Sequence, residues 1–309
     1  MSVLKQATGD DWIAYNADCI EVMRQLPSES IGFSIFSPPY MSLYCYSPSE
    51  RDIGNCATDD EFWGHFGFVI DELMRLTKPG RIVAVDAMNV PAMKERDGYI
   101  GIKDFRGDLI RQFTARGFIF HSEHVCWKDP LVEATRSKAI GLMHKQLCKD
   151  SAMCRAGLAQ FLLAFRKPGK NEDPIDHPNG LETFVGEDPP TTGNLAHERW
   201  RRYASPVWTD IDFGRTLNYR IARDGDDERH ISPLALDMIE RGMTLWSKPG
   251  DVVLSPFMGI GSEGYVALQM GRKFVGAELK ASYWSTAVKH LRDACKQTSL
   301  FSEFEAAAQ

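Results

Sequence analysis

The segments 78-KPGRIVAV-85 and 248-KPGDVVL-254 share one local pattern, a Lys-Pro-Gly turn followed by a run of aliphatic residues. Each segment follows a stretch that we expect to be helical, 59–76 in the first case and 233–246 in the second. Proline cannot continue a helix and glycine commonly ends one, so each turn separates a helix from a strand. The repeated order of helix, turn and strand predicts a largely parallel sheet with helices on both faces.

Other strands and helices alternate around these two units. Thr58, with Glu61 three residues later, predicts a capped start for the first helix. Ser232 followed by Pro233 predicts the start of the second helix. Further strands are expected at 12–16, 31–36, 118–127 and 273–277, and further helices at 18–26, 102–117, 261–270 and from 281, before a frayed tail at 303–309. We therefore predict an α/β fold with a doubly wound, mostly parallel sheet.

The middle of the chain, 129–229, does not follow this alternation. Proline, glycine and asparagine interrupt it at 167–169, 188–190 and 192–194, and its apolar residues show little periodicity. We therefore divide the chain into a first half of the core at 1–128, an irregular region at 129–229 and a second half of the same core at 230–309.

Positive charge is concentrated in the same middle region. The 309 residues contain 36 Lys and Arg against 42 Asp and Glu, so the net charge of −6 excludes a strongly basic coat. Between 124 and 170, however, the chain has nine basic residues and only three acidic ones. Between 199 and 223, arginines alternate with aromatic residues. A solvated charged surface is one interpretation. The other is a surface that contacts phosphates, with these candidates: Lys128, Lys145, Arg199, Arg201 and Arg202.

The seven cysteines form no Cys-x-x-Cys pair and no cluster with zinc-ligand spacing. We expect reduced thiols and no metal. The longest apolar runs, such as 161–165, are far shorter than the roughly 20 residues that span a bilayer. The N-terminal residues also lack the apolar core of a secretory signal. These features predict a cytoplasmic protein that does not enter a membrane.

The tetrapeptide Ser37-Pro38-Pro39-Tyr40 directly follows the apolar strand 31–36. Ligands of open α/β sheets bind at the carboxyl ends of strands. Two successive prolines make a stiff turn that offers carbonyl acceptors and few donors. The hydroxyl oxygen of Ser37 and the carbonyl of Pro38 can accept two N–H bonds beside the flat ring of Tyr40. This arrangement fits the amino group of a planar base, whereas the structural alternative is a proline-rich turn that only ends a strand.

A second ligand-binding pattern, 255-SPFMGIGSEG-264, follows the second Lys-Pro-Gly strand. Its glycines allow a tight turn and a close approach of a ligand ahead of a helix N-terminus. Glu278 ends the next predicted strand, where its carboxylate can accept hydrogen bonds from two ribose hydroxyls. Gly259, Gly261 and Gly264 with Glu278 also match a dinucleotide fingerprint. Only 31 residues follow Glu278, however, and a second nucleotide-binding half does not fit there.

The two motifs, in this order, resemble the β-type DNA amino-methyltransferases, which use S-adenosylmethionine. In that family an (Asp/Asn/Ser)-Pro-Pro-Tyr block precedes the target-recognition region, and a Phe-x-Gly-x-Gly block follows it. The resemblance covers about 11–127 and 229–292. It implies a permuted Rossmann-like methyltransferase core with an irregular target-recognition insert. It also implies methylation of adenine N6 or cytosine N4 on a base flipped out of double-stranded DNA. Serine at position 37 occurs with both bases, so the target base stays open.

The resemblance assigns roles to individual residues. The implied catalytic block is Ser37, Pro38, Pro39 and Tyr40. The implied cofactor-binding residues are Asp18, Pro256, Phe257, Gly259, Gly261, Glu278, His230 and Ser232. Two positions depart from the family pattern: Ser255 replaces its usual aspartate, and Glu263 stands where a small residue is common. Asp251 or local backbone groups are expected to take over the structural role of that aspartate.

Other functions remain as alternatives. Methyltransferases that act on RNA or on protein glutamine commonly carry Asn-Pro-Pro-Tyr after the cofactor motif, and the order here is reversed. A nicotinamide oxidoreductase conflicts with the short segment after Glu278, and a DNA-binding protein with an inactive core conflicts with the intact block at 37–40. The resemblance further implies a homodimer and association with the nucleoid through DNA. The sequence reveals neither the recognised site nor a restriction endonuclease partner.

Overall fold

The computed structural model describes residues 4–40, 52–56, 58–92, 97–137, 142, 144–178, 180–181, 197–222 and 233–307, with the side chains of 136–137, 197 and 297–307 excepted. Its main feature is a nine-stranded sheet. The strands are β1 (Lys5–Gly9), β2 (Trp12–Asn16), β3 (Ile31–Phe36), β4 (Thr77–Met88), β7 (Ile119–Cys126), β8 (Gln160–Arg166), β9 (Val207–Trp208), β10 (Val252–Ser255) and β11 (Lys273–Glu278).

The strands lie in the order β1-β2-β11-β10-β3-β4-β8-β7-β9. The five central neighbours from β2 to β4 run parallel to one another. β1 pairs antiparallel with β2, and β8 lies antiparallel between β4 and β7. β9 pairs parallel with β7. The prediction of a mostly parallel α/β sheet is therefore confirmed.

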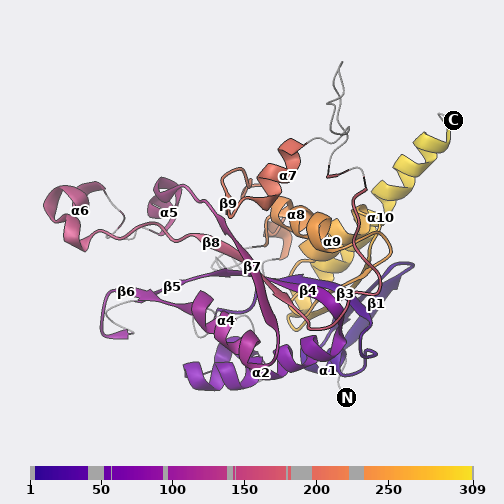
Figure 1. Cartoon of the computed structure of the whole chain (residues 1–309), viewed down its shortest axis with the longest axis horizontal. Coiled ribbons are helices and arrows are strands. Elements are labelled where there is room, and N and C mark those ends of the chain that lie inside the picture. The colour runs from indigo at the N-terminus through magenta and orange to yellow at the C-terminus, as the bar shows by residue number, and fades with distance from the viewer. Residues whose placement is uncertain are drawn as a thin grey trace.

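Helices cover both faces of the sheet, as Figure 1 shows. One face carries α1 (Cys19–Met23), α2 (Asp59–Leu76) and α4 (Phe105–Ala115), and the other carries α8 (Leu236–Trp246), α9 (Ser262–Gln269) and α10 (Ala281–Ala307). Alternate residues of β4 point to the two faces: Ile82 and Ala84 lie in the core under α8 to α10, and Val83 and Val85 lie in the core under α1 to α4. Burial on both sides explains why these strands read as continuous apolar runs.

Smaller elements lie outside this core. They are the hairpin of β5 (Val90–Ala92) and β6 (Gly101–Lys103), the helices α5 (Pro130–Ser137), α6 (His144–Lys149) and α7 (His197–Ala204), and the short 3-10 turns η2 (Ile53–Asn55), η4 (Ser151–Met153) and η5 (Arg220–Ala222). In Figure 1, α5 and α6 project beyond the sheet, whereas α7 lies close to α8 and β9. Within the described residues, no helix combines the length and the hydropathy needed to cross a membrane.

Four predicted boundaries are wrong. The turn predicted at 78–80 lies within β4, which begins at Thr77 directly after α2. α8 begins at Leu236 after the N-cap Ala235, so Pro233 is not its first residue, and Ser232 lies outside the described residues. The helix predicted from 102 begins at Phe105, because the side chain of Asp104 caps it by accepting a hydrogen bond from the Gly107 N–H. The predicted frayed tail is helical as far as Ala307, since nothing between 281 and 307 breaks a helix.

The residue pattern did not predict the strand β8, because 129–229 was expected to be irregular, and the family resemblance indicated only a strand end at 165–168. β8 lies between β4 and β7, and Leu162 to Phe165 are fully buried. A strand with both faces buried shows no polar alternation, so periodicity gives no signal for it. Residues 160–166 therefore belong to the core sheet, and the irregular region is divided into two parts around them.

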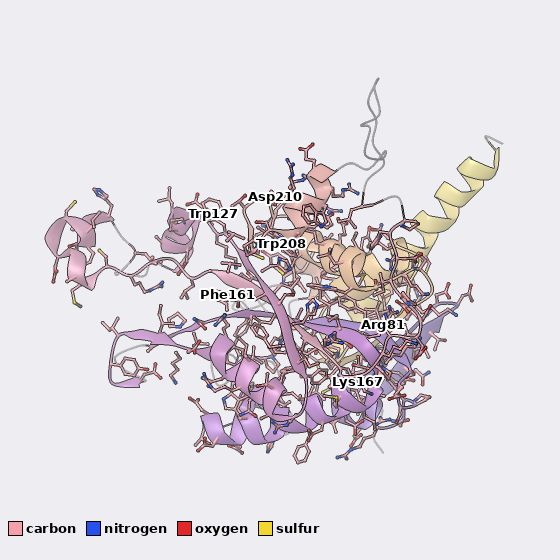
Figure 2. The ribbon with its side chains drawn as sticks, in the orientation of Figure 1. Arg81, Trp127, Phe161, Lys167, Trp208 and Asp210 are labelled. Atoms are coloured by element: carbon pink, nitrogen blue, oxygen red, sulfur yellow. The ribbon has the colours of Figure 1, made fainter. Side chains whose placement is uncertain are left out.

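A buried ion pair joins the amino ends of two strands across β3. Arg81 of β4 donates to the carboxylate of Asp251, which precedes β10, and both side chains are almost completely buried. The β3 residue between them is Gly32, where an added Cβ would lie 2.5 Å from a carboxylate oxygen of Asp251. Glycine is therefore required for the ion pair to cross the strand. Figure 2 shows Arg81 and Lys167 at this end of the sheet and Trp127 and Phe161 at the other.

Candidate functional site

The carboxyl ends of four parallel strands bring polar side chains to one edge of the sheet. Ser37 follows β3, Asp86 lies near the end of β4, Ser255 ends β10 and Glu278 ends β11. Alternation along β4 and β10 directs Asp86 and Ser255 to the face that α8 and α9 cover. The two predicted motifs thus meet at the edge where open α/β sheets bind ligands.

Ser37 is held by a carboxylate from the neighbouring strand. Its hydroxyl donates to Oδ2 of Asp86 at 2.6 Å, and the Gln160 amide donates to Oδ1 of the same group at 2.6 Å. Burial raises the pKa of Asp86, while these two hydrogen bonds and the charge of Lys128 oppose the rise. Because its only hydrogen is directed to Asp86, Ser37 Oγ keeps its lone pairs for other donors.

Sequence reasoning missed Asp86 and Gln160. Asp86 directly follows the apolar run 82–85, as Ser37 directly follows the apolar run of β3, and the residues before them, Val85 and Phe36, are paired in the sheet. The rule that led to Ser37 would also have found Asp86. Gln160 gave no such signal, because β8 itself was not predicted.

The rest of the catalytic block is fixed by packing. Pro38 and Pro39 are buried, and Tyr40 is half-buried. The Tyr40 ring packs against Phe105 with their centroids 5.3 Å apart, and Phe105 stacks in turn on Trp63. The four residues predicted as one block therefore form one, with the tyrosine ring held by an aromatic cluster.

The glycine-rich loop is tied to Glu278. The Gly259 N–H donates to Oε2 of Glu278 at 3.0 Å, and the Lys280 N–H donates to Oε1 at 2.8 Å. Gly259 and Gly261 have φ angles of +51° and +87°, which favour glycine. An added Cβ at Gly259 would enter open space. Burial raises the pKa of Glu278 to about 7. Each carboxylate oxygen also has capacity for a second donor.

Asp18 lies beside this loop, at the carboxyl end of β2. Its Oδ1 accepts hydrogen bonds from the N–H groups of Ile20 and Glu21 at 2.8 and 3.3 Å, which caps α1. The preceding Asn16 donates to the Glu278 and Leu279 carbonyls, both at 2.9 Å. Asp18 thus follows the strand that pairs with β11, and it has a structural role as the N-cap of α1.

Pro256 and Phe257 connect the loop to the catalytic side. Pro256 is buried. The Phe257 ring packs against Phe36, the last residue of β3, at 5.8 Å and stacks on Phe66 of α2 at 6.2 Å. A shift of the glycine-rich loop would therefore disturb the end of β3, directly before Ser37.

Asp251 does not replace the aspartate that the family has at position 255. It lies at the amino end of β10, roughly 13 Å along the strand from Ser255 at about 3.3 Å per residue, and it pairs with Arg81. Ser255 Oγ is fully buried and has no hydrogen-bond partner in the described part of the chain. The prediction that Asp251 takes over the structural role of the family's aspartate is therefore wrong.

The predicted basic residues do not form one cluster. Lys128 lies at the catalytic edge, with its Nζ 4.6 Å from the centroid of the Phe213 ring. Arg201 and Arg202 are exposed on α7, and Arg202 lies 3.8 Å from a carboxylate oxygen of Asp210. Arg199 is half-buried and donates to the Leu181 carbonyl, while Lys145 is exposed on the distant α6 (Figure 1). His230, like Ser232, lies outside the described residues.

Comparison with known proteins gives a consistent result. Residues 31–289 match the DNA methylase family of N6 and N4 methyltransferases. The chain is 25% identical over 284 residues to the type II methyltransferase M1.MboII of Moraxella bovis, and the match covers 88% of this chain and 94% of that protein. It is also 25% identical to M.Cfr9I of Citrobacter freundii, covering 90% and 87% of the two chains.

Solved structures share the fold. A DNA modification methylase of Thermus thermophilus, TTHA0409, complexed with S-adenosyl-L-methionine, has a TM-score of 0.63 at 22% identity, covering 90% of this chain and 92% of that one. The cytosine-N4-specific PvuII DNA methyltransferase has a TM-score of 0.58 at 18% identity, covering 94% and 93%. The resemblance inferred from the two motifs is thereby confirmed. The chain belongs to the DNA methylase family and is an S-adenosylmethionine-dependent DNA amino-methyltransferase.

Proposed function

We propose that the turn at Ser37, Pro38, Pro39 and Tyr40 holds the exocyclic amino group of a flipped adenine or cytosine during methyl transfer. The observation that supports this most strongly is the hydrogen bond from Ser37 to Asp86, which leaves the serine oxygen as an acceptor. Ser37 Oγ and the Pro38 carbonyl accept the two N–H bonds of the amino group. Tyr40, half-buried against Phe105, receives the face of the base.

The two acceptors address the weak nucleophilicity of such an amino group, whose lone pair is delocalised into the ring. By holding both N–H bonds, Ser37 and Pro38 favour a pyramidal nitrogen with a localised lone pair. Most of the acceleration then comes from positioning and from preorganised polar groups. The nitrogen becomes acidic only as it gains the methyl group, so no general base has to act beforehand.

The residues of the glycine-rich loop fit S-adenosylmethionine. Space next to Gly259 admits a ligand, and the carboxylate of Glu278 has acceptor capacity for the ribose hydroxyls. We assign the ribose to Glu278, the adenine end to the neighbourhood of Asp18, and the rest of the binding surface to Pro256, Phe257, Gly259 and Gly261. When bound, the cofactor supplies an electrophilic methyl group on a positively charged sulfur.

We further propose that the parts of 129–229 outside β8 recognise double-stranded DNA. Arg201 and Arg202 are exposed on α7, and Lys128 lies beside the catalytic edge, so these three are our preferred phosphate contacts. Arg199 contributes less, because its guanidinium is engaged with the Leu181 carbonyl. Such an enzyme acts in the cytoplasm at the nucleoid.

The division of roles can be tested with three variants. We expect Tyr40→Ala, which removes the aromatic face, to lower the rate of methyl transfer by about 100-fold or more, because loss of one preorganised contact has such effects. Pro38→Ala keeps the carbonyl but frees the backbone that orients it, so we expect a loss of the same order. Both should bind the cofactor almost as well as the wild type. Glu278→Ala should instead weaken cofactor binding. Calorimetric titration with S-adenosylmethionine and single-turnover rates would measure the two effects, and equal loss of cofactor affinity in all three would refute the division.

The role of α7 can be tested through salt dependence. Each phosphate contact contributes about 0.9 to the slope of log K against log salt on duplex DNA. We expect the double variant Arg201→Ala, Arg202→Ala to reduce this slope by about 2, whereas Arg111→Ala, which removes an exposed arginine of α4, leaves it unchanged. An unchanged slope in the double variant would exclude α7 from the DNA interface.

A further inference from the structure

Glu263 is a buried acid that the proposed mechanism does not use. It lies in the first turn of α9 and is only 4% exposed. Val266 and Ala267, three and four residues later, belong to the core between α8, α9 and the sheet. Residues at these spacings share one side of a helix, so Glu263 lies on the core side of α9. It is at the N-terminal end of the helix, near the carboxyl edge of the sheet.

The surroundings of Glu263 are acidic and incompletely satisfied. Burial, together with the charges of Asp86 from β4 and Glu278 from β11, raises its pKa to about 8. No lysine, arginine or histidine forms an ion pair with Glu263 within the described chain. Ser255, on the same face of the sheet, is buried with its hydroxyl unpartnered. Lys128 acts on Asp86, but no cationic side chain of the described residues acts on Glu263, and a buried carboxylate without a cation is costly unless a ligand supplies one.

Glu263 also lies between the two halves of the proposed site. Asp86 is hydrogen-bonded to Ser37 on the catalytic side, and Glu278 holds the glycine-rich loop on the ribose side. A group that is close enough to both for their charges to act on it lies along the path from the ribose to the target amino group. In S-adenosylmethionine the positively charged sulfur lies on this path, and the methionine chain with its ammonium group branches from that sulfur.

We propose that Glu263 is a cofactor-binding residue whose carboxylate pairs with the positive charge of the methionine end of S-adenosylmethionine. This inference rests on the proposed cofactor site. The cation replaces the missing ion-pair partner, and the unpartnered hydroxyl of Ser255 offers the same end of the cofactor a further hydrogen bond. Glu263 and Ser255 are also the two positions at which this chain departs from the family pattern. A binding pocket with its carboxylate at 263 rather than 255 explains both departures together.

The test measures binding of three ligands by isothermal titration calorimetry at pH 7. S-adenosylmethionine carries a sulfonium and an ammonium, S-adenosylhomocysteine carries only the ammonium, and 5′-methylthioadenosine carries neither. We expect Glu263→Gln and Glu263→Thr to bind S-adenosylmethionine about tenfold or more weakly, and to bind 5′-methylthioadenosine as the wild type does. A similar loss for S-adenosylhomocysteine would assign the contact to the ammonium, and no loss would assign it to the sulfonium. Glu172→Gln, which neutralises an exposed acid, is the matched control.

Proton release gives a second measure. In the free protein at pH 7, a carboxyl group with a pKa of about 8 is mostly protonated. A bound cation stabilises the ionised form, so we expect the wild type to release about one proton more than Glu263→Gln, measured in buffers of different ionisation enthalpy. Asp86 and Glu278 are coupled to Glu263, so the difference reports the titration of the three carboxyl groups together, and it vanishes if Glu263 takes no part in binding.

Two results would overturn the inference. One is unchanged affinity for S-adenosylmethionine in both variants, and the other is an equal loss for 5′-methylthioadenosine, which would indicate a structural role. If Glu263→Gln does not fold, as judged by thermal unfolding, Glu263→Thr carries the test. A wild-type protein that binds none of the ligands would instead contradict the proposed cofactor site itself.

Discussion

Replacement of Asp86 by asparagine is expected to lower the rate of methyl transfer by about 100-fold or more and to leave the affinity for S-adenosylmethionine within about threefold of the wild type. Asp86 accepts the Ser37 hydrogen at 2.6 Å and thereby keeps the serine lone pairs directed to the amino group. An asparagine amide at this position can donate to Ser37 instead and occupy one of those lone pairs. The size of the effect follows the loss of one preorganised catalytic contact. Single-turnover rates with labelled cofactor measure it.

The pH profile distinguishes this role from simple packing. Only the ionised Asp86 accepts hydrogen bonds from both Ser37 and Gln160, so the wild-type rate should fall as the pH drops through its pKa, which burial raises above the ordinary value. Asp86→Asn should remove this dependence. Asp108→Asn, which neutralises an acid on the exposed face of α4, serves as the control. A rate within threefold of the wild type in Asp86→Asn, with an unchanged pH profile, contradicts the role of Asp86.

A second large effect is expected on stability. Arg81→Leu should lower the free energy of unfolding by about 3–5 kcal/mol, because it leaves the carboxylate of Asp251 buried without its cation. The double variant Arg81→Leu, Asp251→Asn should recover part of this loss, since no uncompensated charge remains. Urea unfolding followed by circular dichroism measures both. If Arg81→Leu changes stability by less than about 1 kcal/mol, the ion pair does not hold the amino edge of the sheet.

Much of the fold follows from local sequence signals. The second Lys-Pro-Gly turn separates α8 from β10, and the Thr58 cap starts α2, where its side chain accepts a hydrogen bond from the Glu61 N–H at 3.2 Å. The first Lys-Pro-Gly follows the end of α2 but lies inside β4. Local signals also failed in two places, at the start of α8 and at the strand β8. Ser232-Pro233 resembles a helix start, yet α8 begins three residues after Pro233, at Leu236. The strand β8 is apolar on both faces, so it lacks the alternation that identifies a strand.

The candidate site was only partly predictable for a related reason. Ser37 to Tyr40 and the loop from Pro256 to Gly261 form contiguous motifs, which a single sequence reveals. Asp86, Gln160 and Glu263 instead reach the site from β4, β8 and α9 through the packing of the sheet. Such contacts depend on strand order, which local patterns do not specify. Asp251 was misassigned for the same reason, because its partner Arg81 is distant in the sequence.

The measurement that tests the central claim most directly is transfer of a tritiated methyl group from S-adenosylmethionine to duplex DNA, tRNA and protein offered separately. Digestion of the labelled product to nucleosides then identifies the modified atom. If Ser37 and Pro38 accept the hydrogen bonds of an exocyclic amino group of a DNA base, the label appears in DNA alone, as N6-methyladenine or N4-methylcytosine. Label in tRNA or protein, or on the ring carbon as 5-methylcytosine, would contradict it.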